Sequence, residues 1–427
     1  MKILSTISFI FLIELIYLTK TILSSNLYHL NRYESKVVDF PTTESSLDKR
    51  ESSNDMFSVN FHCSNINKTL CDKTKNVFVK AGKYITATLN LKKPIIVSAQ
   101  FSDYLDVLAN SGPTEMFHYK DSDGKLRLYP STLLKQLSKI SHPRSDINIT
   151  LNLKINYWFE GDPVSILGNQ YDILLVVLHE LIHGLGFTSS WDDYVNKALT
   201  PKAYADNLTP GVIVKNGESS PQFYEYVFDE HLVLLSSRRP LTSITDELNQ
   251  FKSNLPKSFL SEKKLSAEKE KFLDSFANSP QFQIAQDMYK NATTHGTIGF
   301  LLTPDSPSNT QLSQDQINND VVVLETNSNY VPGSSIMHVD LNTYSDTSDF
   351  LMVRGYHPGV TLDNMMFRFG STNSTGPIGP KLRRILGVMG YEIKNNYSPP
   401  NFNSSSFIKF NFVLSLVCTI LLAFIFK

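Results

Sequence analysis

Apolar and polar residues follow two different periods along the chain, and each period predicts an element. In residues 146–159 apolar side chains occupy every second position, which is the period of a strand with one buried face. In residues 171–185 they recur three and four positions apart, as in a helix whose apolar side faces the core. Asp172 stands where the positive end of the helix dipole favours an acid, and Gly184 and Gly186 mark the end of the helix. The central prediction is therefore a strand followed by a buried helix.

Weaker patterns on either side predict further short elements. Strand-like runs are expected at 77–79, 84–91 and 94–101, and a short helix at 133–140. A highly charged stretch at 261–289 predicts helix within a long region rich in loops. Because strands and helices are mixed without a regular alternation, the sequence predicts an α+β fold.

The N-terminal segment has the composition of a cleaved signal peptide. Lys2 is followed by a largely apolar stretch at 3–18 and by small residues at 24–25, so that residues 1–25 are expected to be removed on secretion. Residues 26–56 are polar and lack a helical or strand period. They indicate a leader, a short pro-segment or a linker.

A second apolar run closes the chain. Residues 412–426 are fewer than the roughly 20 that cross a bilayer core. Small residues at 404–406 and a short spacer precede the run, which matches the signal for a glycosylphosphatidylinositol anchor, with a tail-end helix as the alternative. Residues 396–427 are therefore expected to be a linker and an anchor signal. The protein is expected on the extracellular face of the plasma membrane or in the cell wall.

Charge and composition narrow the partners and the compartment. The net charge is −1 at pH 7 and no basic stripe is present, which argues against a nucleic-acid partner. Cys63 and Cys71 are close enough for a disulfide in an oxidising compartment. Sequons for N-glycosylation support secretion. The candidate acceptors are Asn67, Asn148, Asn207, Asn291 and Asn373.

The predicted helix at 171–185 carries a metal-binding pattern. His179 and His183 are four residues apart and share a helix face, so both imidazoles can bind one zinc ion. Glu180 follows the first histidine and can take a proton from a water molecule beside the metal. A chance match would bury two histidines and a glutamate without a metal, which is costly for unpaired polar groups. We therefore expect one zinc ion per chain, with Glu180 as the general base.

A third ligand has to come from elsewhere. A catalytic zinc usually has three protein ligands, and the longer pattern HExxHxxGxxH would place the third histidine at position 189, which is Ser189 here. His231 lies among acidic residues, and His295 and His357 lie in loop-like contexts. A downstream glutamate is a further possibility. Spacing alone leaves these candidates open.

The pattern around His338 resembles the leishmanolysin-like branch of the metzincins, in which an insertion displaces the third histidine. His338 then resembles the third ligand, and Met352 resembles the methionine that turns beneath the metal. Met337 is the rival for that turn, and in that case the third ligand would precede it, for example at His231. The resemblance covers residues 84–190 and 333–394.

The resemblance also implies a domain organisation and an activity. It implies a metzincin-like mixed twisted sheet with the zinc helix in residues 57–187, an insertion at 188–332, and a mainly irregular and helical C-terminal subdomain at 333–395. The implied activity is that of a zinc endopeptidase acting on proteins or peptides, with an edge strand from 146–159 holding the substrate backbone. The alternatives are a surface adhesion protein on an inactive metzincin scaffold and a zinc hydrolase acting on another bond. A thiolate of Cys63 or Cys71 could keep such an enzyme latent.

Overall fold

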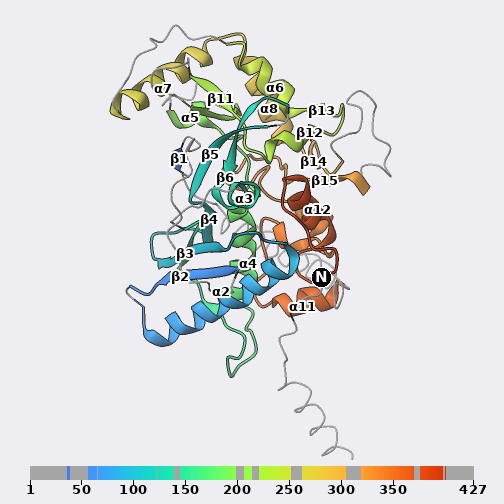
Figure 1. The fold of residues 1–427 in the computed structure, drawn as a ribbon. Helices are drawn as coiled ribbons and strands as arrows, with labels where there is room; N and C mark the ends of the chain where they lie inside the picture. Colours follow the sequence, from blue (N-terminus) through green and yellow to red (C-terminus); the bar gives the residue numbers. More distant parts are fainter. Residues whose placement is uncertain are drawn as a thin grey trace, which may run out of the picture.

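The structure is a computed structural model, and it describes most of the chain between residues 56 and 397 (Figure 1). The described residues are 36–38, 56–64, 66–121, 123–138, 145–198, 206–213, 221–251, 262–303, 319–369, 376–397 and 400. The predicted signal peptide, the C-terminal apolar run and Asn373 lie outside them. Among the described residues, no helix is both long and apolar enough to cross a membrane.

The fold is α+β, and its main sheet has four strands in the order β2-β3-β7-β4. The strands are β2 (Phe57–His62), β3 (Ile95–Ser102), β7 (Ile147–Asn152) and β4 (Ala109–Pro113). β2, β3 and β7 run parallel, and β4 runs antiparallel to β7 at the edge. Helices α2 (Lys68–Thr88) and α4 (Ile173–Gly184) pack against this sheet and against each other (Figure 1).

The prediction that a strand from 146–159 holds the substrate is wrong as to its place in the sheet. The alternating residues do form a strand, β7, but it lies between β3 and β4 and pairs with both. Its backbone groups are therefore used within the sheet. The edge strand beside the predicted metal helix is β4.

The strand-like runs predicted at 77–79 and 84–91 are also wrong, because residues 77–79 and 84–88 belong to α2. Its buried positions follow a helical spacing of three and four residues, whereas the β-branched and aromatic residues within it locally favour a strand. The positions are Cys71, Thr74, Phe78, Ala81, Ile85 and Thr88. The side chain of Asn67 caps the helix by accepting a hydrogen bond from the Leu70 N–H.

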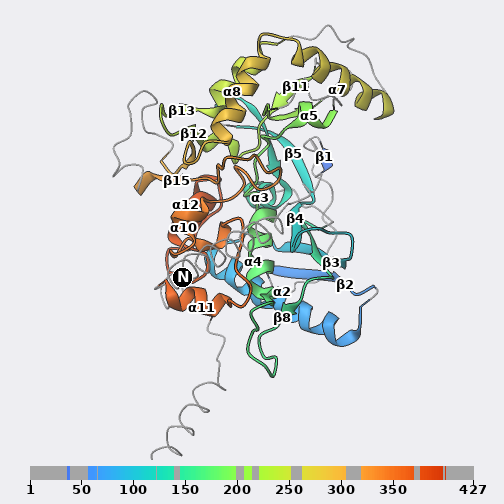
Figure 2. The same cartoon turned by 180° about the vertical axis from the view of Figure 1, so that it is seen from behind.

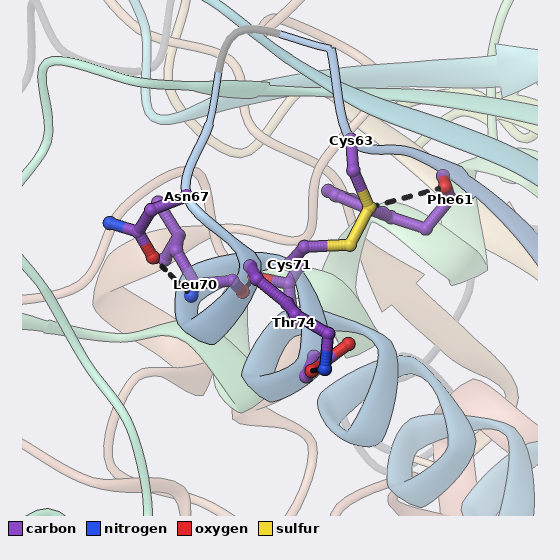
Figure 3. The surroundings of a disulfide bond; sticks show 8 residues. Phe61, Cys63, Asn67, Leu70, Cys71 and Thr74 are labelled. Carbon is purple, nitrogen blue, oxygen red and sulfur yellow. Dashed lines mark hydrogen bonds and ion pairs between the residues drawn. A yellow bond between two sulfur atoms is a disulfide. The ribbon is translucent and has the colours of Figure 1, made fainter.

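A disulfide between Cys63 and Cys71 ties the end of β2 to the first turn of α2 (Figure 3). The two cysteines are eight residues apart in the sequence. Because both sulfur atoms are used in this bond, neither is free to act as a thiolate ligand in this structure. The alternative of latency through a cysteine thiolate is therefore not supported.

Smaller sheets surround the main one. One contains β1 (Lys36–Val38), β5 (Glu115–Lys120) and β6 (Leu126–Pro130), and two are strand pairs, β8 (Tyr157–Trp158) with β9 (Tyr171–Asp172) and β10 (Gly211–Ile213) with β11 (Gln222–Tyr224). The fourth has four strands in the order β13 (Arg239–Pro240), β12 (Leu232–Leu234), β14 (Ile298–Leu301) and β15 (Val321–Val323). The other helices are α3 (Ser131–Leu137), α5 (Tyr194–Ala198), α6 (Leu241–Leu248), α7 (Glu262–Ala277), α8 (Phe282–Ala292), α10 (Leu341–Tyr344), α11 (Leu362–Arg368) and α12 (Pro380–Val388), with 3-10 turns η3 (Asp229–His231) and η4 (Phe350–Met352).

The described part of the segment predicted as an insertion, 188–332, lies mainly at one end of the molecule, opposite α2 and α11 (Figures 1 and 2). It nevertheless shares the main apolar core. Phe187, just after α4, packs on Phe228 with ring centroids 4.9 Å apart, and Phe228 packs on Phe300 of β14 at 5.1 Å. One continuous cluster of buried residues thus runs from α2 through the described part of this segment to α12.

Close packing of α4 on β7 depends on Gly184. A Cβ atom at this position would lie 2.3 Å from Ile147 Cγ2. We expect Gly184→Ala to lower the free energy of unfolding by about 1–3 kcal/mol, because the methyl group forces the helix away from the sheet. Urea denaturation measures the effect. Gly168→Ala is the control, since a Cβ atom there would meet nothing within 4 Å, and equal stability of the two variants would contradict the prediction.

Candidate metal centre

Helix α4 presents His179, Glu180 and His183 from a fully buried element. Asp172 caps its N-terminus by accepting a hydrogen bond from the Leu174 N–H at 2.9 Å. Gly186 has a φ of 103°, a left-handed conformation that glycine adopts freely, and it lets the chain turn away directly after the helix. The sequence therefore fixes both ends of the helix that carries the pattern.

His338 reaches the same place from the C-terminal part of the chain. The carbonyl of His338 accepts a hydrogen bond from the Glu325 N–H at 2.8 Å, next to β15. On the other side, the N–H of Val339 donates to the Met352 carbonyl at 2.8 Å. The backbone at His338 is thus held between the end of the predicted insertion and the turn that contains Met352.

The three histidines converge through their Nε2 atoms. The Nε2–Nε2 distances are 3.2 Å from His179 to His183, 3.2 Å from His179 to His338, and 3.3 Å from His183 to His338. Nitrogen atoms bound to one tetrahedral zinc at the usual bond length lie about 3.3–3.4 Å apart. The spacing of the three side chains therefore fits a zinc ion without rearrangement.

The other ring nitrogen of each histidine faces a backbone carbonyl. His179 Nδ1 lies 2.7 Å from the Leu351 carbonyl, His183 Nδ1 lies 2.7 Å from the Phe187 carbonyl, and His338 Nδ1 lies 2.9 Å from the Ser334 carbonyl. A carbonyl only accepts, so each Nδ1 carries the proton and each Nε2 presents a lone pair. Three buried lone pairs facing one another repel, and a cation between them would remove that repulsion.

Glu180 is buried next to these ligands, with 3% of its surface exposed. Burial raises the pKa of its carboxyl group to about 7. Among the described residues its Oε2 atom has no hydrogen-bond partner, while its backbone carbonyl accepts a hydrogen bond from Ser111 Oγ of β4 at 2.7 Å. A buried carboxylate with an unused oxygen beside a metal site is suited to accept a proton.

Met352 and Met337 are both buried close to the centre. Met352 lies in η4, which packs against α4, and the carbonyl of the preceding Leu351 accepts the hydrogen bond from His179. The hydroxyl of Thr188 donates to Met337 Sδ at 3.6 Å. Met352 therefore belongs to the turn that orients one of the three histidines, whereas Met337 adjoins the third.

The alternative third ligands lie elsewhere. Within the part of the chain that the structure describes, His179, His183 and His338 form the one group of three His, Cys, Asp or Glu side chains close enough to share a metal. His231 packs its ring against Phe300 at 5.2 Å, and burial lowers its pKa to about 4. His295 pairs with Asp340 at 2.9 Å, and His357 is exposed.

Residue Ser189, where the longer pattern expects a histidine, faces the predicted insertion. Its Oγ donates to Asp229 Oδ1 at 2.6 Å, and the N–H of Ser190 donates to Asp229 Oδ2 at 2.9 Å. Asp229 is fully buried. This contact cannot be predicted from the sequence, because the two partners are 40 residues apart and the residues around Asp229 resemble an exposed acidic run.

The chain matches the family described as SPBPB7E8-like over residues 30–417. It belongs to the SPBPB7E8-like family. It is also similar to a Schizosaccharomyces pombe protein named "Uncharacterized protein PB7E8.01", with 28% identity over 404 residues that cover 85% of this chain and 67% of the relative. No solved structure matches.

Neither comparison names a reaction, so the function has to be argued from the site. All three histidines and Glu180 fall inside the span that matches the SPBPB7E8-like family. That span also covers the segment 188–332.

The candidate glycosylation sites differ in access. Asn67 is exposed at the start of α2, and its Oδ1 is used for capping. Asn148 and Asn291 are half-buried. Asn207 is fully buried, and its amide donates to Asn196 Oδ1 at 2.9 Å, so the folded chain leaves no room for a glycan there. The expectation for Asn207 is therefore corrected.

The buried histidines predict unusual resistance of zinc binding to acid. Burial lowers the pKa of His179 to about 3 and of His183 to about 4, and it holds the pKa of His338 well below its ordinary value. A lowered pKa means that protons compete with the metal only at lower pH. Three exposed histidines would lose about a thousandfold in zinc affinity between pH 7.5 and 5.5. We expect a loss below about tenfold here.

Competition with a chelator of known affinity, repeated across this pH range, measures the effect. Zinc release with a midpoint near pH 6.5 would contradict the prediction. A short zinc-binding peptide with three exposed histidines serves as the control for the chelator's own pH dependence.

Proposed function

We propose that this chain is a zinc-dependent endopeptidase with a metzincin-like active site. The observation that carries the proposal is the convergence of three buried histidine Nε2 atoms within 3.2–3.3 Å, next to the buried carboxyl group of Glu180. A scaffold kept only for folding or adhesion would not need such a costly buried group. This favours catalysis over the adhesion alternative.

His179, His183 and His338 would hold the zinc ion, which supplies Lewis acidity toward a carbonyl oxygen and toward water. The backbone carbonyls behind the rings keep each Nε2 unprotonated and aimed at one point. Glu180 would take a proton from the attacking water and give it to the leaving amine, which balances the hydrolysis of one peptide bond.

Strand β4 is the feature that favours a peptide as substrate. It is the edge strand on the side of α4, and within the described residues it pairs with β7 alone. An extended peptide could add to such an edge through backbone hydrogen bonds. The hydrogen bond from Ser111 of β4 to the backbone of Glu180 fixes the distance between this edge and the general base.

A cavity of about 480 Å³ lies on the far side of Tyr356. The Tyr356 hydroxyl is 3.3 Å from His179 Nδ1, so the cavity and the metal centre share a wall. Leu341, Val353 and Met365 contribute apolar side chains to its lining. The lining also carries the charged side chains of Asp346, Arg354 and Arg368, and the cavity adjoins His179 on the Nδ1 side, away from the converging Nε2 atoms, so we assign it no substrate group.

Secretion and attachment to the cell surface remain part of the proposal. The disulfide between Cys63 and Cys71 supports an oxidising compartment. The anchor itself is inferred from the sequence alone, as a lipid anchor or a tail helix.

The experiment that tests the function is zinc analysis together with peptide digestion by the full chain, produced through a eukaryotic secretory pathway. We expect one zinc ion per chain and cleavage at internal peptide bonds, lost on chelation and restored by zinc. Bound zinc without cleavage of any member of a broad peptide library would favour the adhesion alternative or hydrolysis of another bond. Absence of zinc would overturn the proposal.

A further inference from the structure

Asp229 is a buried carboxylate that the proposed chemistry does not use. It is fully buried, and no Lys, Arg or His among the described residues lies within ion-pair distance of it. Its oxygens accept hydrogen bonds from Ser189 Oγ at 2.6 Å, from the Ser190 N–H at 2.9 Å and from the Tyr226 N–H at 2.8 Å. Burying a carboxylate without a cationic partner costs free energy, which these three hydrogen bonds partly offset. The burial of Asp229 therefore requires an explanation.

Two of these hydrogen bonds come from the segment that follows the zinc helix. This segment begins with Phe187, whose carbonyl accepts the hydrogen bond from His183 Nδ1 at 2.7 Å. Ser189 is two residues beyond that carbonyl. The ring of Phe187 also packs on Phe228, the neighbour of Asp229, at 4.9 Å. Residues 228–229 thus hold the segment 187–190 in place, and the orientation of His183 depends on the Phe187 carbonyl in that segment.

The segment 187–190 also contacts Met337, the residue before His338. The hydroxyl of Thr188 donates to Met337 Sδ at 3.6 Å, and Met337 precedes His338. A shift of residues 187–190 would therefore change the position of the Phe187 carbonyl and the packing beside His338 together. Held in place, the segment keeps two ligands from different parts of the chain in register.

We propose that Asp229 is a positioning residue for the metal centre: it fixes residues 187–190, and through the Phe187 carbonyl it sets the direction of His183 Nε2. The inference rests on the proposed zinc site. It gives the segment 188–332 an indirect role in metal binding, through the contacts of Asp229 with Ser189 and Ser190.

The test compares Asp229→Ala and Asp229→Asn with Glu225→Ala in the full chain. Glu225 is the matched control, because it is also a buried acid of the insertion and accepts a hydrogen bond from Thr245 Oγ1 at 2.6 Å. The measurements are the zinc dissociation constant by chelator competition, the visible absorption spectrum after cobalt(II) substitution, and the urea midpoint of unfolding. The cobalt spectrum reports ligand geometry, which a general loss of stability would not alter.

We expect Asp229→Ala to weaken zinc binding about tenfold or more and to change the cobalt spectrum. Asp229→Asn keeps the volume and an acceptor for the two backbone N–H groups, so it should fall between Asp229→Ala and the unmodified chain. Glu225→Ala should lower the urea midpoint and leave zinc affinity within about twofold of the unmodified chain.

Wild-type zinc affinity and an unchanged cobalt spectrum in the Asp229 variants would overturn the proposal. If Asp229→Ala does not fold, Asp229→Asn decides by the same two readouts. If the unmodified chain does not bind zinc, the proposed function is overturned as well. The two failures are distinguishable, because the first is seen only in the Asp229 variants and the second is seen in the unmodified chain.

Discussion

Glu180→Gln is expected to lower kcat for peptide hydrolysis by about a thousandfold or more while one zinc ion per chain is retained. The amide has nearly the same shape as the carboxyl group but cannot take a proton from water. The three histidine Nε2 atoms are untouched by the change, since Glu180 is not one of the converging ligands. The measurements are single-turnover cleavage of a quenched peptide and the zinc content of the same sample.

Glu225→Gln is the matched control for this experiment. Glu225 is buried, and burial raises its pKa to about 7, as for Glu180, but it lies in the segment 188–332 and contacts Thr245. The control should keep the rate of the unmodified chain within a few fold. A Glu180→Gln variant that cleaves at the original rate would remove Glu180 from the mechanism. If Glu180→Gln loses both its zinc and its cleavage activity, Glu180 would instead have a structural role in the metal site.

His338→Ala is expected to weaken zinc binding by more than about a hundredfold, beyond the range usual for residues that only orient a ligand. The change leaves two histidines on α4, which is one ligand fewer than catalytic zinc sites usually have. Isothermal titration against a competing chelator measures the dissociation constant.

His231→Ala is the control, because the side chain of His231 is only 10% exposed, its pKa is also lowered, and it is the main alternative to His338 as third ligand. Its removal should leave a similar cavity in the core and an unchanged zinc affinity. The opposite result, with zinc lost in His231→Ala and retained in His338→Ala, would reassign the third ligand. Retention in both variants would point to a carboxylate.

The chemistry of α4 could be predicted from the sequence because it is local. Two histidines four residues apart, an acid at the helix start and glycines at its end all lie on one 12-residue helix or directly beside it. Helix α2 shows that local reading can also fail. A helical period runs through Phe78, Ala81, Ile85 and Thr88, but the β-branched and aromatic residues of the same segment favour a strand.

The order of the strands and the role of Asp229 could not be predicted, because both depend on contacts between distant segments. Alternation along β7 shows one buried face but does not say whether the strand lies inside the sheet or at its edge. Asp229 stands in a sequence of acids and aromatics that suits an exposed turn equally well. Only the folded chain brings it to Ser189.

The position of His338 between β15 and the turn at Met352 has a consequence for the order of folding. It is 155 residues from His183, and the intervening chain must close before the three nitrogens meet. Contacts of such long range form late, after most of the apolar surface is buried. A zinc ion would therefore be captured by a nearly complete fold, so we expect it to slow unfolding far more than it speeds folding.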